Sequence, residues 1–123
     1  MGQQAETGFQ QSIQREIEKR GGYVVKQHGS MIAAVGIPDL LICYKGYYIA
    51  LEAKVNGNTP SKAQGVNLRN IIKAGGLTAV VWTMKEVKKL LDFIDNDIIF
   101  YNNKQIGWRD FLKDNNIDIG DKW

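Results

Sequence analysis

Residues 36–54 read GIPDLLICYKGYYIALEAK, two runs of strand-forming residues separated by a short turn. Residues 37–44 are mostly apolar, residues 45–46 form the turn, and residues 47–55 form the second run. Apolar runs that are rich in Ile and Tyr and bounded by a turn are typical of paired strands. We therefore predict a β-hairpin over these residues.

The hairpin is expected to bring two carboxylates together. A turn centred on residues 45–46 pairs residues whose numbers sum to about 91, so Asp39 is expected opposite Glu52. Side chains alternate between the two faces of a strand, so Glu52 and Lys54 point to the same face. The pattern therefore predicts that Asp39, Glu52 and Lys54 lie close together.

This group of side chains suits a divalent cation. Neighbouring carboxylates repel each other unless a cation lies between them. Mg²⁺ takes one or two carboxylates and keeps positions for water and phosphate oxygens. We therefore expect Mg²⁺ or Mn²⁺ on Asp39, Glu52 and the backbone carbonyl of Ala53, with Lys54 holding the attacking water. The alternatives are a turn role for Asp39 and a solvated strand face for Glu52 and Lys54.

The rest of the chain supplies elements around this hairpin. Apolar residues every three or four positions indicate helices, and short β-prone runs indicate strands. We expect helices at residues 8–20, 61–74, 85–94 and 108–113, and strands at residues 23–26, 77–83 and 98–101. The core order α-β-β-β-α-β predicts an α/β fold with a mixed sheet flanked by helices. We expect one domain, residues 1–123, with a core at about 8–94 and a C-terminal extension at 95–123.

Composition narrows the class of protein. The chain is 44% apolar and 24% charged, which is typical of a soluble globular protein. No apolar run reaches the roughly 20 residues of a membrane helix and no signal peptide is recognisable, so we expect a cytoplasmic protein, in the host cytoplasm if the chain is viral. A net charge of +3 is compatible with a DNA partner. The only cysteine, Cys43, lies in an apolar run and is expected to be buried.

The motifs resemble those of the PD-(D/E)xK nuclease superfamily, in the elements Pro38-Asp39 and Glu52-Ala53-Lys54. More narrowly, the chain resembles the virus-type replication-repair nuclease (VRR-NUC) domain, in the runs at residues 36–41, 52–54, 61–64 and 75–76. The resemblance implies a restriction-endonuclease-like core and metal-dependent hydrolysis of DNA that leaves a 5′-phosphate and a 3′-hydroxyl. Minimal VRR-NUC proteins resemble Holliday junction resolvases, which implies a homodimer that acts on branched DNA in repair or recombination.

The resemblance also implies further site residues. Gln64 matches a glutamine on the helix after the second motif, and Gln10 stands where the family usually has an acid on the first helix. Glu6, one turn earlier, is the alternative if that helix starts sooner. Lysine and arginine dominate phosphate binding, so we expect DNA contacts from Lys26, Arg15 and Lys62, and from His28 in a loop.

Several alternatives stay open. Residues 61–64 and 7–10 both fit a capping box, which would make the roles of their glutamines structural. A glutamine in place of an acid also allows a nuclease-fold module that binds DNA without cutting it. A nuclease with little preference for branched DNA is a third possibility. In a homodimer, the apolar run 31–35 and the segment beyond residue 95 are the expected interface.

Overall fold

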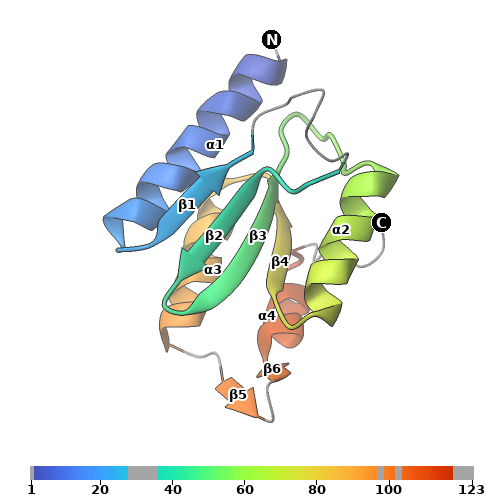
Figure 1. Ribbon diagram of the computed structural model, residues 1–123. Coiled ribbons are helices and arrows are strands. Elements are labelled where there is room, and N and C mark those ends of the chain that lie inside the picture. Colours follow the sequence, from blue (N-terminus) through green and yellow to red (C-terminus); the bar gives the residue numbers. More distant parts are fainter. Residues whose placement is uncertain (1, 28–35, 97–98, 102–103, 118–123) are drawn as a thin grey trace.

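The computed structural model describes residues 2–27, 36–96, 99–101 and 104–117 (Figure 1). The elements are α1 (Gly2–Lys19), β1 (Tyr23–Lys26), β2 (Leu40–Tyr44), β3 (Tyr47–Ala53), α2 (Lys62–Lys73), β4 (Leu77–Val81), α3 (Met84–Asn96), β5 (Ile99–Tyr101), β6 (Lys104–Ile106) and α4 (Trp108–Asp114). The predicted α-β-β-β-α-β order is confirmed. In the described part of the chain, no helix has both the length and the apolar character that crossing a bilayer requires.

The four-stranded sheet has the order β1-β2-β3-β4. The first three strands pair antiparallel, and β3 pairs parallel with β4, so the predicted mixed sheet is confirmed. The hairpin has the predicted register, because Leu40 pairs with Leu51 and Tyr44 with Tyr47. The same register, continued by one residue, sets Asp39 opposite Glu52. The strands therefore carry these two residues to the end of the hairpin remote from its turn.

Helices α1 and α3 cover one face of the sheet, and α3 passes behind the strands in Figure 1. Ile13 and Ile17 of α1 and Leu90 of α3 are buried in one cluster with the inward side chains of the strands. These inward positions recur every second residue, as in Leu40 and Ile42 of β2. Burial of this apolar surface holds the two helices against the sheet.

Helix α2 packs on the opposite face, against β4 (Figure 1). Leu68 of α2 is buried, as are Ala50 and Val80 of the strands, and none of the three belongs to the first cluster. No helix of the described residues packs on the half of this face over β1 and β2, where Tyr23 and Val25 are exposed. Cys43 lies there and is exposed, so the expectation that it is buried was wrong. Strand alternation points Cys43 away from the core although its neighbours along the chain are apolar.

Helix α1 is longer than predicted. It begins at Gly2 instead of residue 8, because residues 3–6 (Gln-Gln-Ala-Glu) are good helix formers. Thr7 is therefore inside the helix, and the predicted capping box at residues 7–10 was wrong. The C-terminal part adds a two-stranded sheet of β5 and β6, of which only β5 was predicted. Phe111 of α4 stacks on Phe93 of α3 with ring centroids 4.3 Å apart, which anchors α4 to the core.

Candidate metal and nuclease site

Two carboxylates are held by reciprocal hydrogen bonds across the hairpin. The backbone N–H of Asp39 donates to Glu52 Oε1 over 3.2 Å, and the backbone N–H of Ala53 donates to Asp39 Oδ2 over 2.9 Å. Each carboxylate is thus oriented by the backbone of the opposite strand. This arrangement depends on the hairpin register, since a shift of one residue would move both side chains to the other face.

Lys54 completes the group. Its Nζ lies 3.2 Å from Glu52 Oε2, and the side chains of Lys54 and Glu52 are 12% and 0% exposed. The alternative of a solvated strand face was therefore wrong. Glu52 Oε2 nevertheless accepts no hydrogen bond, so its contact with Lys54 is electrostatic and not well directed. The structure leaves one buried carboxylate oxygen without a hydrogen-bond donor.

The pKa of Glu52 lies far above the ordinary value of a glutamate. Burial, followed by the nearby negative charge of Asp39, raises the pKa of Glu52 to about 8, and the positive charge of Lys54 offsets this only in part. A strongly raised pKa beside a specific charged partner is characteristic of functional sites. A divalent cation would favour the ionised carboxylate and satisfy Oε2, so the residues fit such an ion.

The set of ligands is small. Among the residues that the structure describes, no three or more His, Cys, Asp or Glu side chains gather in a metal-binding group. The site brings together the carboxylates of Asp39 and Glu52. The carbonyl of Ala53 as a third ligand stays a prediction. This set suits Mg²⁺, which takes few protein ligands and completes its shell with water and substrate phosphate.

Helix α2 begins beside this site, and Gly36 allows the backbone before Asp39 to lie close to this helix. Gly36 has φ of +83°, and a Cβ there would lie 2.5 Å from the carbonyl carbon of Ala63. The backbone before Asp39 therefore lies directly against the first turn of α2. Gly36 belongs to the motif at residues 36–41, but this contact was not predicted, because the packing partner lies 27 positions further along the chain.

Gln64 takes part in the predicted capping box of α2. Ser61 Oγ accepts a hydrogen bond from the backbone N–H of Gln64, and Gln64 Oε1 accepts one from the backbone N–H of Ser61. The capping role of Gln64 is thus confirmed. Its role in catalysis stays a prediction.

The fold of this chain is similar to that of solved structures, among them the following two. A structure described as "VRR_NUC domain" matches with a TM-score of 0.60 and 26% sequence identity, covering 75% of this chain and 96% of that one. The chain has a VRR-NUC-like nuclease fold. Archaeoglobus fulgidus Hjc, a Holliday junction resolvase from an archaeal hyperthermophile, matches with a TM-score of 0.51 and 20% identity, over 63% of this chain and 67% of that one. No family model and no curated protein matches the chain.

In this VRR-NUC-like fold, α1 starts early enough to carry Glu6, the predicted alternative to Gln10. Gln10 is 8% exposed inside α1. Burial raises the pKa of Glu6, one turn earlier, and the charges of Lys54 and Asp39 also act on it. Glu6 is therefore the α1 carboxylate within electrostatic range of the site. The early start of α1 is the feature that places it there.

The predicted DNA contacts of the VRR-NUC-like fold are spread over the surface. Lys26 ends β1 beside Asp39, whose carbonyl accepts a hydrogen bond of 2.7 Å from the backbone N–H of the next residue, Gln27. Lys62 is exposed in the first turn of α2, at the same end of the sheet. Arg15 lies about 13 Å further along α1 than Glu6, so the structure does not bring it to this end. His28 lies outside the described residues.

Proposed function

We propose that this chain is a Mg²⁺- or Mn²⁺-dependent deoxyribonuclease. The observation that carries this proposal is the buried Glu52, with an oxygen that accepts no hydrogen bond, beside Asp39 and Lys54. Folded proteins rarely keep a buried polar atom without a hydrogen bond unless a ligand or a function requires it. The likeness to a VRR-NUC domain structure supports a nuclease over other metal-dependent enzymes.

In this proposal, Asp39, Glu52 and the carbonyl of Ala53 hold the cation. The cation would polarise the scissile phosphate and lower the pKa of a bound water. The ammonium of Lys54 orients the attacking water and neutralises charge that builds on the phosphate. The backbone N–H groups of Asp39 and Ala53 keep the two carboxylates in place as substrate enters. Water attacks phosphorus in line as the bond between phosphorus and the 3′-oxygen breaks. The oxygen of the water stays on the 5′-phosphate, and a proton passes to the leaving oxygen, which becomes the 3′-hydroxyl.

We further propose that the substrate is branched DNA and that the enzyme is a homodimer. The fold is shared with a Holliday junction resolvase, and a dimer with C2 symmetry would present two sites to two strands of a junction. Lys26 and Lys62 lie at the end of the sheet that carries the site, where they would contact backbone phosphates.

The decisive experiment compares cleavage of a four-way junction and of linear duplex DNA with Mg²⁺, Mn²⁺ or EDTA. We expect metal-dependent cleavage that favours the junction. Lys54→Met should abolish cleavage and keep the rise in melting temperature that Mg²⁺ produces, because the lysine is not a metal ligand. Lys19→Met, at an exposed lysine in the last turn of α1, is the matched control. A wild-type protein that cuts neither DNA with either metal would contradict the proposal.

The second candidate function is a nuclease-fold module that binds DNA without cutting it. Gln10 motivates it, since an amide contributes no charge to a metal. Wild-type protein that binds the junction without cleavage, together with cleavage by Gln10→Glu, would establish this second function. If Glu6 supplies the missing charge, wild-type protein should cleave and Glu6→Gln should reduce the rate.

A further inference from the structure

The chain reverses direction directly after Lys54, in the green loop that joins β3 to α2 in Figure 1. The backbone N–H of Asn58 donates to the carbonyl of Val55 over 3.0 Å. Between these two residues, φ is +55° at Asn56 and +75° at Gly57. Two central residues with positive φ are characteristic of a type I′ turn. Residues 55–58 therefore form a tight turn that begins immediately after the lysine of the candidate site.

Trp82 ties this turn to the end of β4. The backbone N–H of Lys54 donates to the carbonyl of Val81 over 3.0 Å, so the hydrogen bonds between β3 and β4 continue beyond Ala53. The indole N–H of Trp82, the residue after β4, donates to the carbonyl of Asn58 over 2.8 Å. The backbone before the turn and the backbone at its end are therefore bonded to two successive residues of the chain.

The backbone of Trp82 is itself fixed by the start of α3. Glu86 Oε1 accepts hydrogen bonds from the backbone N–H groups of Trp82 over 2.8 Å and of Thr83 over 3.0 Å. Thr83 Oγ1 accepts one from the backbone N–H of Glu86 over 3.2 Å, which completes a capping box. Among the described residues, Trp82 is half-buried and does not belong to the apolar cluster that α1 and α3 cover. The helix start therefore presents the indole to the turn at residues 55–58.

The ammonium of Lys54 depends on its backbone for its position. It lies 3.2 Å from Glu52 Oε2, but this oxygen accepts no hydrogen bond, so the contact attracts the ammonium without directing it. Displacing a catalytic group by about 1 Å can lower a rate by about 100-fold. A contact that fixes the backbone beside Lys54 is therefore expected to affect catalysis.

We propose that Trp82 is a positioning residue of this site. Its hydrogen bond to Asn58 holds the turn at residues 55–58, and the turn holds the backbone of Lys54, so that the ammonium stays on the attacking water. This inference rests on the role of Lys54 in the proposed function. Trp82 acts through Lys54 and not through the carboxylates that hold the cation.

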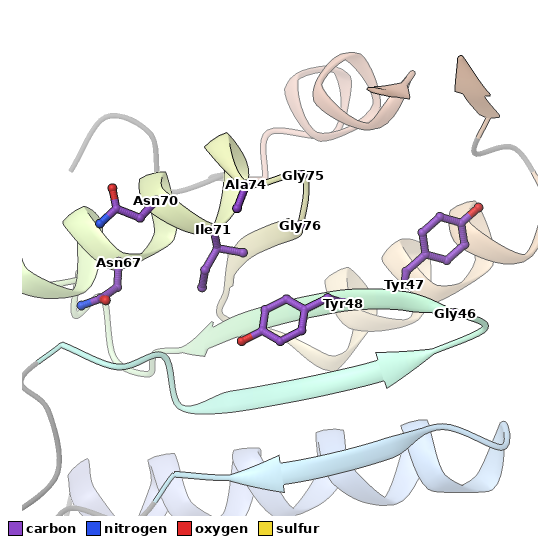
Figure 2. A pocket seen from close by; sticks show the side chains of 9 residues that line it. All are labelled: Gly46, Tyr47, Tyr48, Asn67, Asn70, Ile71, Ala74, Gly75 and Gly76. Atoms are coloured by element: carbon purple, nitrogen blue, oxygen red, sulfur yellow. The ribbon is translucent and has the colours of Figure 1, made fainter. Parts of the chain in front are cut away.

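Helix α2, into which the same loop leads, has anchors of its own. In its first turn, Ala63 lies against Gly36. At its C-terminal end, Gly76 lies against Ile71 of α2 and Tyr48 of β3, which line the cavity shown in Figure 2. Loss of the indole hydrogen bond should therefore leave α2 in place over the site carboxylates and leave cation binding unchanged.

The first experiment removes the indole N–H. Trp82→Phe deletes it, and 3-benzothienylalanine at position 82 deletes it while keeping the size of the ring, because sulfur replaces the N–H. We expect both changes to lower kcat for junction cleavage by at least about tenfold, with unchanged KM for DNA. The rise in melting temperature that Mg²⁺ produces should also stay unchanged. Lower stability with an unchanged kcat would make Trp82 a structural residue and overturn the inference.

Tyr44→Phe is the matched control for this experiment. It also removes one hydrogen-bond donor from an aromatic side chain, in a bond of 2.7 Å to Asp95 at the turn end of the hairpin. It should keep the wild-type kcat, because Tyr44 lies far from the turn at residues 55–58. An equal loss of kcat in Tyr44→Phe would show that the effect is not specific to Trp82 and would overturn the inference.

The second experiment measures Lys54 itself, without DNA or metal. Mass spectrometry gives the rate at which each lysine is acetylated, with exposed Lys62 as the internal reference. The side chain of Lys54 is only 12% exposed, and its rate should rise at least about threefold in both variants at position 82, because the turn opens more often. An unchanged rate would overturn the inference.

The two experiments separate this inference from the proposed function. If wild-type protein does not cleave but Lys54 becomes more reactive in the variants at position 82, the nuclease function fails and the positioning of Lys54 by Trp82 stands. If wild-type protein cleaves and these variants cleave at the same rate, only this inference fails.

Discussion

A carboxylate lies at each end of the β2–β3 hairpin: Asp95 of α3 at the turn, and Glu52 of β3 at the candidate site. The two carboxylates differ in their hydrogen bonds. At the turn, Asp95 of α3 accepts a hydrogen bond of 2.7 Å from the Tyr44 hydroxyl, and Lys45 Nζ lies 2.9 Å away. Arg20 Nη1 donates to its other oxygen over 3.4 Å. At the site end, Glu52 is fully buried, and Oε2 accepts no hydrogen bond.

The pKa of Asp95 is lowered and the pKa of Glu52 is raised, each relative to its ordinary value. Burial alone would raise the pKa of Asp95, but the hydrogen bonds from Lys45 and Tyr44 lower it below its ordinary value. Burial and Asp39 raise the pKa of Glu52, and Lys54 offsets this rise only in part. A carboxylate with hydrogen bonds to both oxygens connects the elements around it. A carboxylate with one oxygen that accepts no hydrogen bond has that oxygen available to a ligand. The contacts of Asp95 therefore stabilise the fold at the turn end, whereas the burial of a charged Glu52 at the site end costs stability.

The largest expected effect comes from removing the charge at the site end. Glu52→Gln should lower the cleavage rate by at least about 100-fold, because the cation and the developing charge lose a ligand. It should also raise the free energy of unfolding without metal by about 1–3 kcal/mol, because the folded protein then no longer buries a negative charge beside that of Asp39. Cleavage kinetics and urea denaturation in EDTA measure the two effects. Unchanged cleavage together with lower stability would make Glu52 a structural residue.

A smaller effect is expected when the distance between the site and α2 changes. Gly36→Ala should lower stability by about 2–4 kcal/mol, because it adds a clash with Ala63 to the strain of a positive φ. Gly57→Ala is the matched control, with φ of +75° and nothing within 4 Å of its Cβ. Thermal denaturation and junction cleavage should show a greater loss for Gly36→Ala in both. Equal losses in the two variants would show that the contact with α2 does not matter.

At the turn end, Asp95→Asn should have the opposite profile to Glu52→Gln. It should lower stability by about 1 kcal/mol, because the hydrogen bond from buried Tyr44 loses its charged acceptor and the side chain is only 23% exposed. Cleavage at saturating metal should stay unchanged, since Asp95 lies at the other end of the hairpin. A cleavage defect as large as that of Glu52→Gln would remove the distinction between the two ends.

The smallest effect concerns pH. A carboxylate whose pKa is lowered by folding contributes stability above its unfolded pKa, and this stability is lost as pH falls through the folded pKa. Asp95 is such a group. Between pH 5 and pH 3, the wild type should therefore lose more stability than Asp95→Asn, as measured by urea denaturation. Identical pH dependence in the two proteins would show that the contacts of Asp95 do not persist in solution.

The sequence by itself determined the local features. Residues 45–46 set the length of the turn, and strand alternation then fixed which residues face each other, so the register of Asp39 and Glu52 was predictable. The capping box at residues 61–64 was predictable for the same reason, since its partners are three residues apart. The start of α1 was misjudged, because the apolar pattern begins at Phe9 although helix-forming residues precede it.

Only the tertiary structure decided which of these side chains are covered. Cys43 and Glu52 point to the same face of the sheet, yet Cys43 is exposed and Glu52 is 0% exposed. Helix α2 covers one end of that face and leaves the other open, and its position depends on packing partners far apart in the chain, such as Gly36 and Ala63. Alternation assigns a side chain to a face, but burial depends on what else packs there. The packing of α2 on this face therefore buries Glu52, and this burial raises the pKa of its carboxyl group.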